Sequence, residues 1–192
     1  IELVGKDIGA GTNATDVVSY GLIPAMTVVG EKFQSGSIYI PEMMLAAKVM
    51  SAVLDHFKDQ LAGKEDKKLG TVIIGTGQGD LHDIGKNLVA MMLEGQGFSV
   101  IDLGVSVGPE QFVKAVTANK PDIVALSALL TTTMIEMKNT ISALNEAGLK
   151  DSVKIVVGGA PVTQSFADEI GEDGYGYDSP GAAQICKELV SA

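Results

Sequence analysis

The sequence contains no arginine and no tryptophan, a single cysteine and only two histidines. Because lysine supplies all 14 basic residues, the bidentate recognition of phosphate or carboxylate that arginine provides is not expected. The net charge of -10 and the lack of a basic patch argue against nucleic-acid binding. The lone Cys186 cannot form an internal disulfide, which is typical of a reducing, cytoplasmic protein, and its helical surroundings favour a structural role.

Long hydrophobic runs are also missing. None approaches the roughly 18 residues that a membrane-spanning helix needs, so we expect no membrane association. The first residues lack the basic-then-apolar pattern of a signal peptide. The chain begins at Ile1 rather than Met, and whether its N-terminus is truncated stays open. A composition of 46% hydrophobic and 20% charged residues over 192 residues is typical of a globular protein with one large domain, or with one domain and a smaller one.

Residues 1–62 show only helical periodicity. The apolar residues at helical spacing are Leu22, Met26, Val29 and Phe33, followed by Met43, Ala47, Met50, Leu54, Phe57 and Leu61. Pro41 suits the first turn of the second helix and Gly63 its end, with a turn between the helices at residues 34–37. Residues 1–10 suggest the remnant of an earlier helix. So few helices need a partner surface, and we predict a small helical domain over residues 1–62 that packs on something else.

A charged linker at 63–69 separates this region from a different pattern. Apolar runs of strand length alternate with helical patterns, and the nearly continuous apolar character of the runs is typical of a parallel sheet covered on both faces. The predicted strands are 71–75, 99–103, 122–126, 153–157 and a weaker 173–177, and the predicted helices are 84–96, 108–119, 134–147, 161–170 and one from Pro180. Residues 70–192 therefore predict an α/β domain with a doubly wound, five-stranded parallel sheet of the Rossmann or flavodoxin-like kind.

The loop after the first predicted strand holds one of the two histidines. His82 follows Asp80 by two residues, and a carboxylate that orients an imidazole is a common arrangement around a metal ligand. The carboxyl end of a parallel strand is also where such sheets bind ligands. The alternative is an ordinary surface histidine with Asp83 as a helix cap. The glycines at 77, 79 and 85 allow tight turns but do not have the spacing of a phosphate-binding loop.

Two further loops stand at predicted strand ends. Residues 127–133 carry four hydroxyls, of which helix capping by Thr132 or Thr133 would explain one. Residues 158–161 (Gly-Gly-Ala-Pro) have no bulky side chain. They either form an ordinary turn with Pro161 in the first helical turn or leave room for something flat or large.

Together these segments resemble the cobalamin-binding corrinoid proteins of methyltransferase systems. The resemblance rests on D-x-H-x-x-G at Asp80, His82 and Gly85, on S-x-L at Ser127 and Leu129, and on the glycine pair Gly158-Gly159. Residues 30–33 and 40–43 resemble the helical cap that precedes the domain in this family, and the B12-binding module of cobalamin-dependent methionine synthase has the same arrangement. The resemblance covers roughly residues 12–185.

The resemblance implies a base-off/His-on cobalamin. His82 would replace the cofactor's own dimethylbenzimidazole as the lower axial ligand of cobalt, with Asp80 as its hydrogen-bond acceptor. Thr133 would end the relay, at a position where methionine synthase has serine. His82 is thus the implied metal ligand, and His82, Asp80 and Thr133 are the implied catalytic residues.

The resemblance also implies which residues contact the cofactor. They are Gly79, Asp80, Leu81, His82, Asp83, Ile84 and Gly85 in the first loop; Ser127, Leu129, Thr131, Thr132 and Thr133 in the second; Gly158, Gly159 and Ala160 in the third; Tyr177 and Asp178 near the tail's far end; and Tyr39 and Met43 in the cap. For Met43, a place in the helical core is an equal alternative.

The implied function is that of a methyl carrier, not catalytic alone. Cobalt would cycle between Co(I) and methylcobalamin, loaded by a substrate-specific methyltransferase and unloaded by a second one that uses a tetrahydrofolate or a thiol, with a reductive activase as a further partner and residues 63–69 as a hinge. The alternatives are a B12-binding isomerase subunit, a B12 sensor, and a flavodoxin-like or receiver domain without B12. The helical cap favours methyl transfer, and a sensor would need a DNA-binding segment, for which no basic helix is present.

Overall fold

A computed structural model describes residues 14–56 and 69–191 of the chain. Its five strands are β1 (Thr71–Thr76), β2 (Ser99–Asp102), β3 (Ile123–Ser127), β4 (Lys154–Gly158) and β5 (Gly174–Gly176). All pair in parallel, in the order β2-β1-β3-β4-β5. The predicted fold class, a doubly wound five-stranded parallel sheet with a helical part in front, is confirmed.

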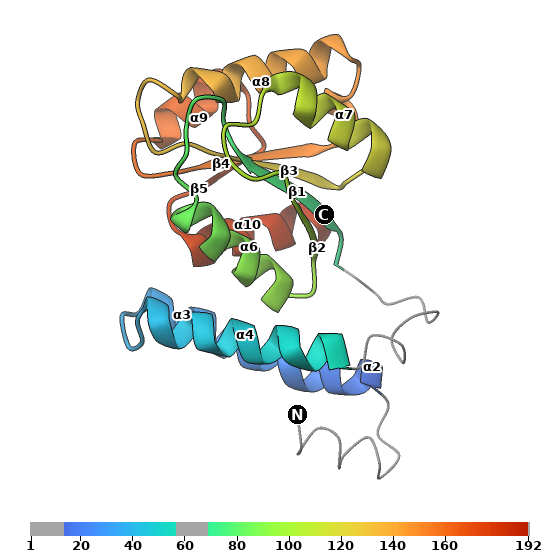
Figure 1. Ribbon diagram of the computed structural model, residues 1–192, viewed down its shortest axis with the longest axis vertical. Helices are drawn as coiled ribbons and strands as arrows, with labels where there is room; N and C mark the ends of the chain where they lie inside the picture. The colour runs from blue at the N-terminus through green and yellow to red at the C-terminus, as the bar shows by residue number, and fades with distance from the viewer. Residues whose placement is uncertain (1–13, 57–68, 192) are drawn as a thin grey trace.

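Helices cover both faces of the sheet, as the apolar strands require (Figure 1). The helices α6 (Ile84–Gly95) and α10 (Ser179–Ser191) lie on one face, and α7 (Pro109–Asn119), α8 (Ile135–Glu146) and α9 (Gln164–Ile170) lie on the other. A short 3-10 turn, η2 (Lys150–Ser152), precedes β4. Val72 and Ile73 on adjacent positions of β1 are both fully buried, because their side chains point into opposite covered faces.

One predicted helix start is wrong. Residues 161–163 form a turn, so Pro161 is not in the first turn of α9. Thr163 caps this helix instead, and its hydroxyl accepts a hydrogen bond from the Phe166 amide at 3.3 Å. A hydroxyl that satisfies a free amide defines the helix start more strongly than proline, which only tolerates that position.

The N-terminal helices form a pair under α6 and α10 (Figure 1). The first runs through α2 (Ala14–Asp16), a π-helical stretch η1 (Val17–Leu22) and α3 (Ile23–Gln34), and the second is α4 (Ile40–His56). The turn between them follows Gln34, as predicted. The expected helix at 1–10, the end at Gly63 and linker residues 63–68 lie outside the described residues. No helix in the described part of the chain is long and apolar enough to cross a membrane.

Small residues let the helical pair approach α6 closely. A side chain at Gly30 would place its Cβ 2.6 Å from Met92 Cε, and one at Gly95 would lie 3.1 Å from Met26 Cβ. Met43 is fully buried and belongs to the same hydrophobic cluster as Met92 and Leu93. The partner surface that the helices need is therefore the outer side of α6 and α10.

The strand order brings three loops to one edge of the sheet. It reverses between β1 and β3, which is the point where open α/β sheets bind ligands. Thr76 at the end of β1 pairs with Ser127 at the end of β3, and Ser127 pairs with Gly158 at the end of β4. The loops that follow these strands are the ones that the sequence singles out.

The acid stability of the fold is predicted to depend on Asp173, beside β4 and β5. Burial alone would raise the pKa of Asp173, but hydrogen bonds from Lys150 and the Ile155 amide, together with the charge of Lys150, leave that pKa below its usual value. Asp173 thus contributes stability above its unfolded pKa of about 3.9, and this is lost as the pH falls through the folded pKa. Asp173→Asn should lower the free energy of unfolding at pH 7 by about 1–2 kcal/mol.

Urea unfolding at pH 7 and at pH 3 measures this effect. The difference between Asp173→Asn and wild type should shrink at the lower pH, because protonation of Asp173 makes its side chain neutral, as asparagine is at every pH. Asp151→Asn in the exposed η2 turn is the control and should leave the unfolding curve unchanged at both pH values. A difference that stays constant with pH would contradict the assignment.

Candidate functional site

A fully buried carboxylate, Asp80, joins the loops after β1 and β3. Its Oδ1 accepts hydrogen bonds from the His82 amide at 3.1 Å and from the His82 ring at Nδ1, 2.7 Å away. Its Oδ2 accepts from the Leu129 amide at 2.7 Å, the Leu130 amide at 3.3 Å and the Thr133 hydroxyl at 2.7 Å. A continuous set of hydrogen bonds thus joins Thr133, Asp80 and His82, the three residues of the predicted relay.

These hydrogen bonds keep Asp80 ionised. Burial alone would raise the pKa of Asp80, but the bonds from the Leu129 amide, the Thr133 hydroxyl and His82 hold it well below its usual range. An ionised acceptor fixes the proton of the His82 ring on Nδ1. The lone pair on Nε2 is then free for a metal, and the His82 side chain, 52% exposed, can reach one.

The backbone of the His82 loop is also held. The buried hydroxyl of Thr76 donates to the His82 carbonyl at 2.9 Å. Gly79 adopts a φ of +81°, which favours glycine, and its amide donates to the Ser106 hydroxyl at 3.0 Å. His82 is therefore a positioned side chain, unlike an ordinary surface histidine.

At neither of the two predicted helix caps does a side chain form a hydrogen bond to the free amides of the helix. Asp83 precedes α6, but its carboxylate accepts from the Asn87 side chain at 3.1 Å instead of from the helix backbone. No side-chain hydrogen bond caps the start of α8 at Met134, and the Thr133 hydroxyl is used by Asp80. The capping interpretation is thus wrong for Thr132 and Thr133.

A cavity of about 560 Å³ opens beside His82, between α6, the strand ends and the start of α10. The predicted cofactor contacts that line it are Leu81, His82, Asp83, Ile84, Gly85, Ser127, Leu129, Gly158, Gly159, Ala160, Tyr177 and Asp178. Lining residues that the sequence did not single out include Lys86, Leu88, Val89 and Ala182. Most of the predicted residues thus meet around one cavity, although they come from distant parts of the chain.

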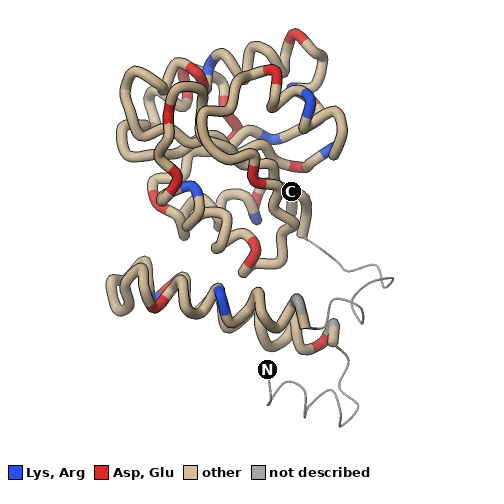
Figure 2. The backbone as a smooth tube through the Cα atoms, in the orientation of Figure 1, with Lys and Arg blue, Asp and Glu red and all other residues tan. Residues whose placement is uncertain are grey.

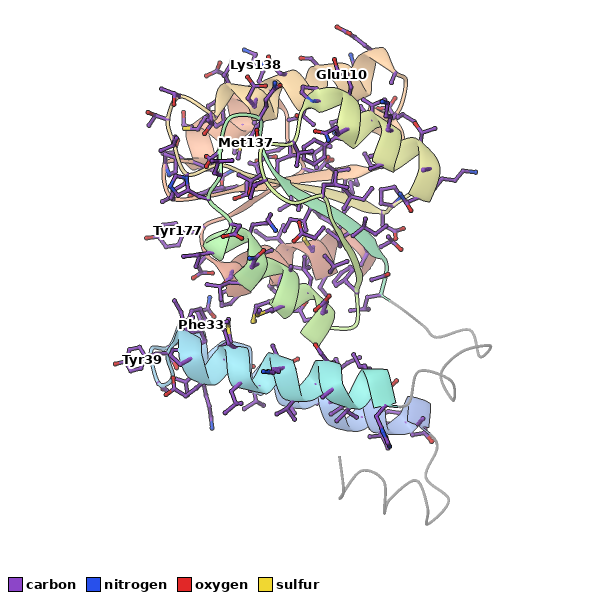
Figure 3. The ribbon with its side chains drawn as sticks, in the orientation of Figure 1. Phe33, Tyr39, Glu110, Met137, Lys138 and Tyr177 are labelled. Carbon is purple, nitrogen blue, oxygen red and sulfur yellow. The ribbon has the colours of Figure 1, made fainter. Side chains whose placement is uncertain are left out.

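The other predicted contacts lie elsewhere. Gly79, Asp80 and Thr133 do not line the cavity, and Thr131 and Thr132 are exposed in the turn before α8. Tyr39 is 70% exposed at the start of α4, and in Figure 3 it and Phe33 lie at the end of the helical pair, on the side toward which Tyr177 points. Met43 is buried in the core, the alternative noted for it. Contact with a cofactor stays a prediction for all of these residues, and equally for those that line the cavity.

The glycine pair has a structural cause of its own. Gly159 has a φ of +133°, and any side chain there would overlap the carbonyl of Ala128. A Cβ on Gly158 would lie 2.9 Å from the carbonyl oxygen of Gly176. Neighbouring backbones thus exclude side chains at both positions, and the smooth cavity wall is a consequence of that packing.

The site fits a large apolar cofactor that brings its own metal. Leu81 and Ile84 are each 72% exposed and Tyr177 is 85% exposed, so apolar side chains surround the cavity with little to cover them. Within residues 14–56 and 69–191, no group of three or more His, Cys, Asp or Glu could hold a bare metal ion. A metal bound by His82 would therefore need ligands other than such a group of described side chains, as a metal carried by a cofactor has.

Charge gives no support to a polyanionic partner. The lysines lie singly along the described chain, interspersed with acidic residues (Figure 2). Lys86 is the lysine that lines the cavity.

Comparison with known proteins identifies the family. A model described as a B12 binding domain matches residues 70–183, and a second with the same description matches residues 1–58. The chain belongs to the B12-binding domain family. The predicted cofactor, cobalamin, and the resemblance to corrinoid proteins are thereby confirmed.

Relatives within this B12-binding family have similar lengths. Trimethylamine corrinoid protein 2 of Methanosarcina mazei is 44% identical over 98% of this chain and 88% of its own length. The trimethylamine corrinoid protein of Methanosarcina barkeri is 43% identical over 99% and 88%.

Solved structures of B12-binding proteins are similar to this one. The methanol:cobalamin methyltransferase complex MtaBC of Methanosarcina barkeri matches with a TM-score of 0.90 at 33% identity, covering 100% of this chain and 73% of that one. A cobalamin-binding protein from Desulfitobacterium hafniense matches with a TM-score of 0.81 at 32% identity, covering 98% and 89%.

The Thr133 hydroxyl is predicted to matter for stability because it serves a buried charge. Thr133→Val keeps the shape but removes one donor from Asp80, and should lower the free energy of unfolding at pH 7 by about 1–3 kcal/mol. Thr133→Ser keeps the hydroxyl and is the matched control. Chemical unfolding of the cofactor-free protein measures both, and a valine variant as stable as the serine variant would argue against the relay.

Proposed function

We propose that this chain is a corrinoid methyl carrier that binds cobalamin with His82 as the lower axial ligand, in place of the cofactor's own base. The observation that carries the proposal is the hydrogen-bonded series Thr133–Asp80–His82 at the mouth of the apolar cavity. It leaves one ring nitrogen available to a metal and commits the other to a buried carboxylate. The names of the corrinoid relatives support the same role.

Thr133, Asp80 and His82 would together control the position of one proton on the His82 ring. While Nε2 of His82 holds a metal, the ring is neutral and Asp80 accepts from Nδ1. When Nε2 is released it can take up a proton, and the carboxylate of Asp80, 2.7 Å from Nδ1, stabilises the resulting imidazolium. Thr133 donates to the other carboxylate oxygen and moderates the basicity of Asp80. When bound, the corrin would supply a strongly nucleophilic cobalt that accepts and gives up a methyl group.

The proposal also divides the chain into three functional parts. Residues 1–62 would form a cap, 63–69 a linker and 70–192 the cofactor domain. With Met43 enclosed against α6, the helical pair would have to move in order to cover the cofactor, with the linker as the hinge.

The proposed partners are a donor methyltransferase, an acceptor methyltransferase that uses a tetrahydrofolate or a thiol, and a reductive activase. For the donor we favour a methylamine, because among the solved structures the monomethylamine corrinoid protein of Methanosarcina barkeri is 37% identical, against 33% for the methanol system.

Replacing His82 tests the axial role. His82→Ala leaves the rest of the cavity wall intact, so the protein should still take up hydroxocobalamin, with a lower affinity. After reduction to Co(II), the EPR lines of wild type made with ¹⁵N-histidine should show ¹⁵N splitting, and those of His82→Ala made in the same way should show at most the ¹⁴N splitting of the cofactor's own base. His56→Ala removes the other histidine and should behave as wild type. A ¹⁵N splitting that persists in His82→Ala, or that is absent from wild type, would contradict the proposal.

The donor proposal has its own test. The loaded protein is combined with methyltransferases for trimethylamine, dimethylamine and methanol in turn, and loss of each donor is followed by NMR. Demethylation of a methylamine well ahead of methanol is expected, and a preference for methanol would contradict this part alone.

A further inference from the structure

Lys86 is buried in the first turn of α6, a position that is unfavourable for a lysine. It is the third residue of α6, and its side chain is only 2% exposed in the wall of the cavity. A positive charge in the first turn of a helix opposes the helix dipole. Burial of an ammonium group also costs free energy unless the charge is paired and hydrogen-bonded. An apolar residue would satisfy both constraints, so the lysine calls for another explanation.

The ammonium group connects α6 to the end of β2. It forms an ion pair with Asp102, the last residue of β2, and donates to Asn87 Oδ1 at 2.6 Å. Asn87 in turn donates to Asp83 twice, from its side chain to the carboxylate at 3.1 Å and from its amide to the carbonyl at 2.8 Å. One branch of hydrogen bonds thus runs from Asp102 through Lys86 to the residue after His82.

A second branch starts from the same carboxylate. The other oxygen of Asp102 accepts from the Gly104 amide at 2.8 Å. The Gly104 carbonyl accepts from the Thr76 amide at 3.0 Å, and the Thr76 hydroxyl donates to the carbonyl of His82 at 2.9 Å. Both branches from Asp102 therefore end at the His82 loop, at the His82 carbonyl and at Asp83.

Stability of the fold is a weak reason for this pair. Replacing a buried ion pair with apolar residues is often neutral or stabilising. The Asp102 side chain is 39% exposed, so water can solvate it if the lysine is removed. Lys86→Met would then leave no buried unpaired charge.

We infer that Lys86, through Asp102 and Asn87, is a positioning residue that holds the His82 loop ready to coordinate the metal. The inference rests on the proposed function, because it assumes that His82 is the ligand. Asp80 sets the orientation of the imidazole, and Lys86 sets the position of the backbone that carries it.

The test compares Lys86→Met with wild type, with and without cofactor. In the cofactor-free protein, the amides of residues 81–85 should exchange with solvent faster in the variant, while those of β3 and β4 should not. With hydroxocobalamin, affinity should fall by about 10-fold. After reduction to Co(II) in protein made with ¹⁵N-histidine, a fraction of the EPR signal should lose the ¹⁵N splitting of the imidazole.

Two further variants keep the result interpretable. Asp102→Asn weakens the same ion pair from its exposed end and should give the same changes to a smaller degree. It serves as the test if Lys86→Met does not fold. Lys150→Met breaks a partly buried ion pair with Asp173 at the opposite edge of the sheet, and should leave exchange at 81–85 and the EPR signal as in wild type.

The outcomes separate the inference from the proposed function. A wild-type protein whose EPR signal lacks imidazole splitting would overturn the proposed function. The positioning role alone would be overturned if wild type shows the imidazole splitting and both Lys86→Met and Asp102→Asn leave that splitting unchanged. Amide exchange at residues 81–85 would also have to be unchanged in both variants.

Discussion

A buried, ionised carboxylate has to be surrounded by hydrogen-bond donors, and in this protein that requirement organises the site. Asp80 is fully buried, and its donors come from two loops that are far apart in the sequence. Loss of one donor leaves a buried charge partly unsatisfied, which is costly. The same carboxylate that binds the β3 loop also fixes the tautomer of His82, so the local stability and the chemistry of the site share one group.

The rest of the molecule brings these loops together. The reversal of strand order between β1 and β3 places both loops at one edge, and pairing of Ser127 with Gly158 adds the third. Close backbone contacts at Gly158 and Gly159 keep the wall between them free of side chains. The outcome is an apolar cavity with one exposed imidazole, which suits a large cofactor whose metal already has most of its ligands.

The parts of this arrangement that depend on local pattern could be predicted from the sequence. Apolar runs between turn residues indicated all five strands, and the spacing of Asp80 and His82 indicated an oriented imidazole. Parts that depend on contacts between distant segments could not be predicted in this way. The need for glycine at 159, for example, comes from the Ala128 carbonyl across the sheet edge. The Thr163 cap of α9 is by contrast a local signal, which was missed because Pro161 was favoured as the helix start. The role of Lys86 was not predicted because its ion-pair partner, Asp102, lies on the strand β2 and not on the same helix. The sequence did hold a signal, because a lysine in the first turn of a helix is unfavourable.

The central claim is that His82 itself donates to the cobalt, and isotopic labelling of histidine tests it most directly. The measurement is the EPR spectrum of the Co(II) protein made with ¹⁵N-histidine in a His56→Asn background, in which His82 is the remaining histidine. If His82 is the axial ligand, the multiplicity and spacing of the nitrogen splitting must change from the ¹⁴N to the ¹⁵N pattern. A splitting that stays in the ¹⁴N pattern would show that the nitrogen belongs to the cofactor and would contradict the account.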